Sequence, residues 1–216
     1  KMSLRIRNSI TNAYINKVLE YCQRLLLSKT INLSDKYVDG RINSVKDEAI
    51  IRGILLEDRV LRTRLKEPSD PRAFGDIYLD MSEFKVPDFP INIKSFDTTN
   101  KNQRNNLCGI VKLINYMYND KRCRDKVGIA RAVKNSPLQI QRYGLIILSK
   151  TENKVWCGTF DEVPESQIFI NPSNGFQISY PKDRVRRDDR QYMNMVKSKT
   201  RELFEKWAEP LKVFEH

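Results

Sequence analysis

The sequence contains a single histidine, His216. A side chain at the end of a chain is usually too mobile to be held in a catalytic geometry. Ser-His-Asp hydrolases, His-based nucleases, zinc metalloproteases and zinc fingers all need a positioned imidazole. We therefore expect none of these classes, and any catalysis must depend on carboxylates and lysines.

Cysteines and long apolar runs are also scarce. The four cysteines, Cys22, Cys108, Cys123 and Cys157, show no CxxC spacing, which favours reduced thiols packed as small apolar groups. No stretch approaches the roughly 20 apolar residues that a membrane span needs, and the first residues lack the apolar core of a secretory signal. These absences predict a cytoplasmic protein without membrane association.

The charge of the chain is strongly positive. Its 216 residues include 39 Lys and Arg against 27 Asp and Glu, a net charge of +12. Such an excess favours a polyanionic partner, and the absence of a polybasic anchor or lipidation signal makes a membrane surface the weaker option. The length and the ordinary content of 8 Gly and 9 Pro predict one globular domain, residues 1–216.

Hydrophobic periodicity predicts an α/β fold with a mixed central β-sheet flanked by helices. Helical spacing occurs over 9–29, 107–118 and 188–207, and a further helix is expected from Ser44 to about Leu65, with Ser44 as its cap and Asp47 in its first turn. Strands are expected at 76–80, 89–94, 143–148, 155–160, 167–170 and 176–180. A strand, a helix and a buried strand after residue 89 indicate a βαβ unit.

Three polar residues of the first two strands are placed to converge. Alternation with Ile91 and Ile93 puts Asn92 and Lys94 on one face, and Asp76 begins the neighbouring strand. Phosphodiester hydrolysis needs oxygens for a hard divalent cation and a lysine to orient the attacking water. Glu48, on the preceding helix, could supply another oxygen. The plainer interpretation of Asp76 and Lys94 is a surface ion pair.

These residues resemble the motif of the PD-(D/E)xK nuclease superfamily, and within it the type II restriction endonucleases of the EcoRV and HincII kind. The matching stretches are Gly75-Asp76-Ile77-Tyr78-Leu79, Ile91-Asn92-Ile93-Lys94, the polar segment that reaches Gln103, Gln167-Ile168-Phe169-Ile170-Asn171 with Phe176-Gln177-Ile178, and the long C-terminal helix. The resemblance spans about 48–207.

The resemblance implies a homodimer that cuts duplex DNA at a short palindrome with Mg²⁺, leaving blunt ends. Asp76, the position of Asn92 and the Ile93 carbonyl would hold the cation, and Lys94 would position the water. The helical segment at about 9–65 would contribute to dimerisation.

Asn92 departs from the family, which has Asp or Glu at this position. An amide offers an oxygen to a metal ion but no charge. Three interpretations follow: the sequence is that of an inactivated variant, another acid such as Glu48, Asp80 or Asp97 completes the site, or the chain has lost cleavage. Two rival functions therefore remain, a structure-specific repair nuclease and a non-catalytic DNA-binding protein.

Three further segments are candidates for DNA contact. The family resemblance implies that the loop with Lys101, Gln103 and Arg104 lies against the duplex. Amides and hydroxyls at a hairpin tip suit base edges, and basic runs suit phosphates. The plain alternatives are a solvated loop, a tight turn and a solvated face. The remaining candidate residues are Asn171, Ser173, Asn174 and Gln177 of the hairpin, and Arg184 and Arg187 of the basic run.

Overall fold

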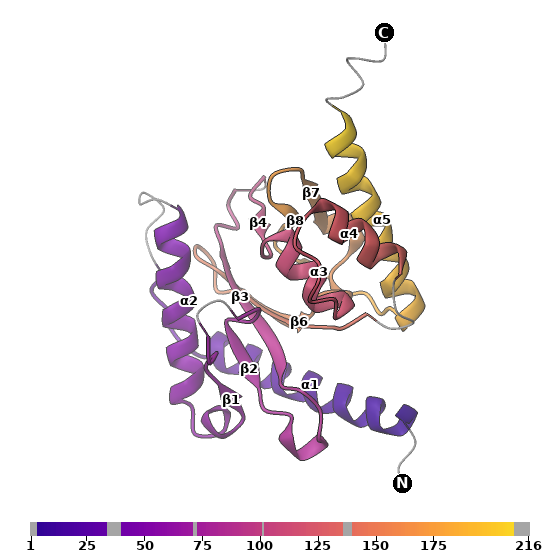
Figure 1. Cartoon of the computed structure of the whole chain (residues 1–216). Coiled ribbons are helices and arrows are strands. Elements are labelled where there is room, and N and C mark those ends of the chain that lie inside the picture. The colour runs from indigo at the N-terminus through magenta and orange to yellow at the C-terminus, as the bar shows by residue number, and fades with distance from the viewer. Residues whose placement is uncertain (1–3, 34–39, 71–72, 101, 136–139, 210–216) are drawn as a thin grey trace. The chain divides into compact units, whose positions relative to one another are not determined.

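The computed structural model describes residues 4–33, 40–70, 73–100, 102–135 and 140–209. The chain forms two compact units. The first comprises Lys1–Gln103 and Tyr143–Phe160, and the second comprises Arg104–Arg142 and Asp161–His216. Figure 1 shows the elements along the chain in colour from indigo to yellow.

The first unit is built on a five-stranded sheet in the order β1-β2-β3-β5-β6. Its strands are β1 (Leu65–Lys66), β2 (Ile77–Leu79), β3 (Phe89–Phe96), β5 (Gly144–Ser149) and β6 (Val155–Thr159). Strands β3 and β5 run parallel, whereas the other neighbours are antiparallel. The prediction of an α/β fold with a mixed sheet is confirmed, including the parallel pair that a βαβ connection requires.

Two helices, α1 (Leu4–Leu27) and α2 (Gly40–Glu57), bury their apolar faces in this unit. Val18 and Cys22 of α1 belong to the same buried cluster as Ile51 of α2 and Ile91 and Ile93 of β3. The alternation of β3 explains this arrangement, because Ile91 and Ile93 point to the helices and Asn92 and Lys94 point to the opposite face. Burial of this apolar face is what fixes the orientation of the polar residues.

The start and end of α2 differ from the sequence prediction. The helix begins at Gly40 and ends at Glu57, and a 3₁₀ turn at Leu61–Thr63 follows. Ser44 therefore lies inside the helix and does not cap it; its hydroxyl donates to Glu48 Oε1 at 3.0 Å. The apolar periodicity continues past Glu57 because Leu61 and Leu65 are also buried, although they lie in the turn and in β1.

The second unit combines three helices with a three-stranded antiparallel sheet in the order β4-β8-β7. The helices are α3 (Ile110–Tyr118), α4 (Lys126–Lys134) and α5 (Asp189–Ala208), and the strands are β4 (Asn105–Asn106), β7 (Ile168–Asn171) and β8 (Gly175–Ile178). The sequence pattern missed α4, since its short apolar face consists of Ile129 and Ala132. Asp125 caps this helix by accepting the backbone N–H of Gly128 at 2.8 Å.

The predicted hairpin and final helix are present in this unit. Strands β7 and β8 pair from Ile168↔Ile178 to Asn171↔Gly175, and Gly175 has φ +80°, which favours glycine. Helix α5 begins with a capping box, in which Asp188 and Gln191 each bond the other's backbone N–H.

All four cysteines are free thiols. Cys22, Cys123 and Cys157 are buried, and burial raises the pKa of the Cys22 thiol to about 12. This agrees with the expected packing as small apolar groups. Within the described residues, no helix has both the length and the apolar character that a membrane crossing requires.

Candidate active site

Lys94 of β3 lies between two carboxylates from other parts of the first unit. Its Nζ is 3.0 Å from Glu48 Oε1 on α2 and 3.7 Å from Asp76 Oδ2, which directly precedes β2. The Lys94 residue is 8% exposed, so this is no surface ion pair. Burial makes the lysine costly to leave unpaired, and the two carboxylates supply the compensating charge. Of the three residues predicted to converge, Asp76 and Lys94 are in contact, and Glu48, considered as a further oxygen, also reaches Lys94.

The register of β2 and β3 explains how Asp76 reaches this position. Ile77 pairs with Ile91, and Asp76 N–H donates to Ile91 O at 2.9 Å. Asp76 lies just before the start of β2, and its side chain takes the place that a further strand residue would have beside β3: its Oδ2 accepts the N–H of Ile93 at 2.7 Å. The N–H and C=O of a strand residue point to the same edge, so the Ile93 carbonyl also faces this edge.

Asn92 shares the face of Lys94 and is 3% exposed. Its Nδ2 is buried and has no hydrogen-bond partner among the described residues. An unsatisfied buried amide costs about 1–3 kcal/mol, and a catalytic or ligand-binding role is one explanation for such a group. We call Lys94, Glu48 and Asp76 the Lys94 cluster. Asn92 lies on the same face as Lys94, and its amide is available to a ligand.

The other two acids considered for this site are engaged elsewhere. Asp80 forms an ion pair with Lys66 at 3.0 Å, and hydrogen bonds from Ser82 lower the pKa of Asp80 to about 2. Asp97 Oδ1 accepts the backbone N–H of Thr99 at 3.0 Å. Of the three acids that could take the place of the missing carboxylate, Glu48, Asp80 and Asp97, Glu48 is the one that contacts Lys94.

The available donors fit a Mg²⁺ ion bound together with its substrate. Within the described ranges no three His, Cys, Asp or Glu side chains gather in a way that could hold a metal ion. Mg²⁺, however, usually keeps several waters and takes only one or two protein carboxylates plus substrate phosphates. Asp76 and Glu48 supply two carboxylates, and Asn92 adds an amide with an unsatisfied buried atom.

A second buried charge cluster lies next to the first, through residues adjacent in sequence. Asp47 is fully buried, accepts the hydroxyl of Ser95 at 2.7 Å and forms an ion pair with Lys150. Asp47 precedes Glu48, and Ser95 follows Lys94. The cluster thus ties α2 to β3 and to the residue after β5, and we infer that it helps hold Glu48 near Lys94.

The sequence prediction did not identify this cluster, although a signal was present. Asp47, Ile51 and Leu55 follow a spacing of four residues, which places the acid on the buried stripe of α2. Asp47 was instead assigned to the first turn, because the helix was expected to begin at Ser44.

The loop after β3 is braced by its own side chains. Gln103 Oε1 accepts the N–H of Asp97 at 2.5 Å, and Asn100 Oδ1 accepts the N–H of Asn102 at 3.1 Å. The oxygen of Gln103 is therefore used to fold the loop. Lys101, another candidate in this loop, lies outside the described residues.

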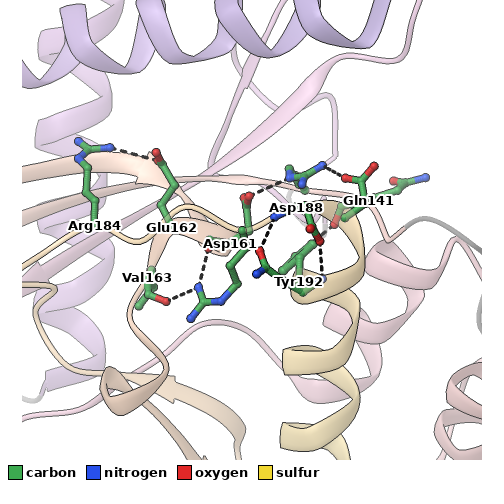
Figure 2. Close-up of polar contacts among 11 residues, drawn as sticks. Gln141, Asp161, Glu162, Val163, Arg184, Asp188 and Tyr192 are labelled. Carbon is green, nitrogen blue, oxygen red and sulfur yellow. Dashed lines mark hydrogen bonds and ion pairs between the residues drawn. The ribbon is translucent and has the colours of Figure 1, made fainter. Parts of the chain in front are cut away.

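The candidate arginines of the basic run contact their own unit. Arg184 Nη1 pairs with Glu162 at 3.1 Å, and Arg187 Nη1 donates to the carbonyls of Asp161 at 2.6 Å and Val163 at 2.8 Å. Figure 2 shows Arg184 pointing to Glu162. Both guanidiniums thus support the segment that leads into α5. The basic run spans residues 182–190. Its other cations, Lys182, Arg186 and Arg190, are exposed and remain for phosphate contact.

Arg142 adds a buried ion pair to the same region. Burial opposes its charge, but the Asp161 carboxylate at 2.9 Å outweighs this effect and the pKa of Arg142 is raised. Arg142 also reaches Asp189 at 2.7 Å, in the first turn of α5. This network has a structural role in anchoring α5.

The hairpin candidates differ in how much of each side chain is available. Asn171 Oδ1 accepts the N–H groups of Ser173 at 2.8 Å and Asn174 at 3.1 Å, so it builds the turn. Ser173 and Asn174 are exposed at the tip. Gln177 lies on β8 and donates from Nε2 to Asn106 Oδ1 at 2.8 Å. Arg104 stacks on Phe169, 3.7 Å from the ring centre.

No model of a known protein family matches this chain, and no curated protein matches it. The features that bear on function are therefore the contacts of Lys94 with Glu48 and Asp76 and the positive charge of the chain.

Proposed function

We propose that this protein is a type II restriction endonuclease that hydrolyses phosphodiester bonds of duplex DNA. The observation that carries the proposal is the buried Lys94 between Asp76 and Glu48, beside the unsatisfied amide of Asn92. Burial of a charged lysine on an otherwise apolar strand costs free energy. A role in phosphodiester hydrolysis would account for it, because the ammonium group can hold a water molecule and neutralise the negative charge that develops on the phosphate.

The roles of the residues follow from their positions. Lys94 orients the attacking water and neutralises negative charge on the phosphate. Asp76, Glu48 and Asn92 surround the same site, and the backbone of Ile93 fixes Asp76 at 2.7 Å. When bound by these oxygens, Mg²⁺ would supply Lewis-acid stabilisation of the phosphoryl oxygens.

A homodimer would match a palindromic site, because a twofold axis presents the same parts to both strands. Exposed apolar side chains support self-association through the segment at 9–65. Ile10, Val45, Ile50 and Val60 are 39–67% exposed, and all four lie in this segment. A monomer in sedimentation at micromolar concentration would contradict this part of the proposal.

A second candidate function is sequence-specific DNA binding without cleavage. The observation that favours it is Asn92 itself, because a buried amide at the position of the second acid lowers the negative charge available to a cation.

Digestion of a mixed-sequence plasmid with Mg²⁺ separates the possibilities. A restriction endonuclease gives discrete bands, and Lys94→Ala should remove them while the protein stays folded. A smear or nicks that depend on DNA structure would indicate a repair nuclease. If neither this chain nor its Asn92→Asp variant cuts, the binding function replaces the catalytic one.

DNA affinity should fall steeply with salt. The net charge of +12 and the exposed Lys182, Arg186 and Arg190 predict several phosphate contacts. Each contact releases counterions, so a few-fold rise in salt should weaken binding by orders of magnitude. Fluorescence anisotropy of a labelled duplex at several KCl concentrations measures the slope. An affinity that is flat between 50 and about 200 mM salt would exclude a largely electrostatic contact.

A further inference from the structure

The three-stranded sheet of the second unit has a polar face with a fixed amide pair. Gln177 of β8 lies opposite Asn106 of β4 on one side and Phe169 of β7 on the other. Residues opposite each other in a sheet share a face. The other face is apolar and consists of Ile168, Ile170, Phe176 and Ile178, all buried. Gln177 and Asn106 therefore point away from the core.

The bond between the two amides leaves a defined set of groups unused. Gln177 Nε2 donates to Asn106 Oδ1, so the Gln177 carbonyl remains an acceptor and the Asn106 amide remains a donor. If the direction of the bond is reversed, the pair still presents one acceptor and one donor. The cross-strand bond also holds both side chains in place, which lowers the entropy lost when they bind a ligand.

Arg104 extends this face with a cation. Its guanidinium is 3.7 Å from the centre of the Phe169 ring, next to Gln177 in the sheet. Arg104 and Asn106 are exposed, and the strands β4, β7 and β8 contain no Asp or Glu. The stretch from Arg104 to Arg142 has nine Lys and Arg but only two Asp. The face, which carries a cation and has no carboxylate in its strands, thus suits a polyanion.

We propose that this face reads base edges in the major groove of duplex DNA, with the Gln177–Asn106 pair on adenine and Arg104 on guanine. The proposal rests on the proposed function, that the chain recognises a specific duplex. Adenine presents an acceptor and a donor in the major groove, which complement the free groups of the amide pair, whereas guanine presents two acceptors for a guanidinium.

The shape of the element favours this ligand over others. The amide pair lies on two neighbouring strands, β4 and β8, and the major groove of B-form DNA admits a two-stranded β-ribbon. The major groove of A-form RNA is too narrow for side chains to read. The hairpin tip is the rival reader, but the oxygen of Asn171 already accepts two backbone N–H groups. The strand face is therefore the better candidate for base recognition.

Selection from a library of randomised DNA duplexes, carried out without Mg²⁺ so that no cleavage occurs, tests the assignment. The wild-type protein should enrich a palindrome with an A·T pair in each half-site. In Gln177→Ala and in Asn106→Ala the preference for that pair should fall roughly 10- to 100-fold. Arg104→Ala should instead relax a G·C position. Thermal unfolding of each variant establishes that it is folded.

Two further variants complete the comparison. Ser173→Ala removes an exposed hydroxyl at the hairpin tip, which is the rival reader, and should leave the enriched DNA sequence unchanged when the strand face reads the bases. Arg190→Ala removes an exposed cation and should weaken binding to all sequences alike.

The outcomes separate the two levels of the proposal. If the wild-type protein enriches a sequence, and Gln177→Ala and Asn106→Ala keep it, the strand face is not the reader although site-specific binding stands. If Ser173→Ala then enriches a different DNA sequence, the hairpin tip is the element that recognises the bases. If the wild-type protein enriches no sequence, the proposed function fails and the inference fails with it. Tighter binding of duplex RNA than of duplex DNA would also overturn it.

Discussion

Asn92→Asp should raise Mg²⁺-dependent DNA cleavage by orders of magnitude. Asn92 is buried on the face of Lys94, whose Nζ lies 3.7 Å from the Asp76 carboxylate. The substitution keeps the size of the side chain and replaces an unsatisfied amide nitrogen with a charged oxygen. A hard cation binds a carboxylate much more strongly than an amide, and the metal ion stabilises charge at the phosphate. The initial rate of plasmid cleavage measures the effect.

Thermal unfolding supplies a second measurement that does not depend on activity. Without Mg²⁺, the Asn92→Asp variant gathers three carboxylates around Lys94, and like charges destabilise the fold. Addition of Mg²⁺ should therefore raise its Tm more than that of the original chain, because a ligand that binds only the folded state stabilises it. Lys94→Ala, added to Asn92→Asp, should abolish the gain in cleavage.

A different result would identify another acid. If the original chain already cuts at full speed and Asn92→Asp adds nothing, Glu48 is the acid that completes the site, and Glu48→Gln should stop cleavage. If neither chain cuts any duplex with Mg²⁺ or Mn²⁺, the catalytic function is excluded.

The sequence predicted the core of the candidate site because strand alternation leaves little freedom. Burial of Ile91 and Ile93 forces Asn92 and Lys94 to the other face. The pairing Ile77↔Ile91 then brings Asp76 to the same edge. These steps need only the period of a strand and one antiparallel neighbour, and both can be inferred from residues 75–95.

Contacts between distant polar residues could not be predicted in the same way. The sequence offered Arg184 and Arg187 as phosphate contacts or as part of a solvated face, but they bind Glu162 and the carbonyls of Asp161 and Val163. Partners of long charged side chains depend on tertiary proximity, for which residue spacing gives no signal. The same holds for Gln177 and Asn106, whose pairing is set by the register of β4 and β8.

Removal of the cation that pairs with the buried Asp47 should cause the largest loss of stability among the variants proposed for this protein. Lys150→Met removes the cation that pairs with this fully buried carboxylate, while the methionine keeps much of the side-chain volume. The Ser95 hydroxyl still donates to Asp47 at 2.7 Å, but a neutral donor cannot balance a charge. Breaking a buried pair by removing one partner typically costs about 3–5 kcal/mol. Urea denaturation of the variant measures the fall in the free energy of unfolding.

The chain offers a matched control for this variant. Lys154 Nζ pairs with Glu152 at 2.9 Å, and both side chains are 40% or more exposed. Lys154→Met should therefore cost less than about 1 kcal/mol, as exposed pairs contribute little.

The double variant Asp47→Asn/Lys150→Met distinguishes a buried charge from lost packing. With both charges removed, the asparagine keeps an acceptor for Ser95 and no carboxylate is left unpaired. We expect the double variant to be more stable than Lys150→Met alone, because replacing both partners of a buried pair costs less than leaving one of them charged. If Lys150→Met is no more destabilising than Lys154→Met, or if the second substitution adds to its cost, the ion pair does not secure α2 against the end of β5. Glu48 would then owe its position near Lys94 to the Ser95–Asp47 hydrogen bond and to the apolar contacts of Ile51 and Leu55.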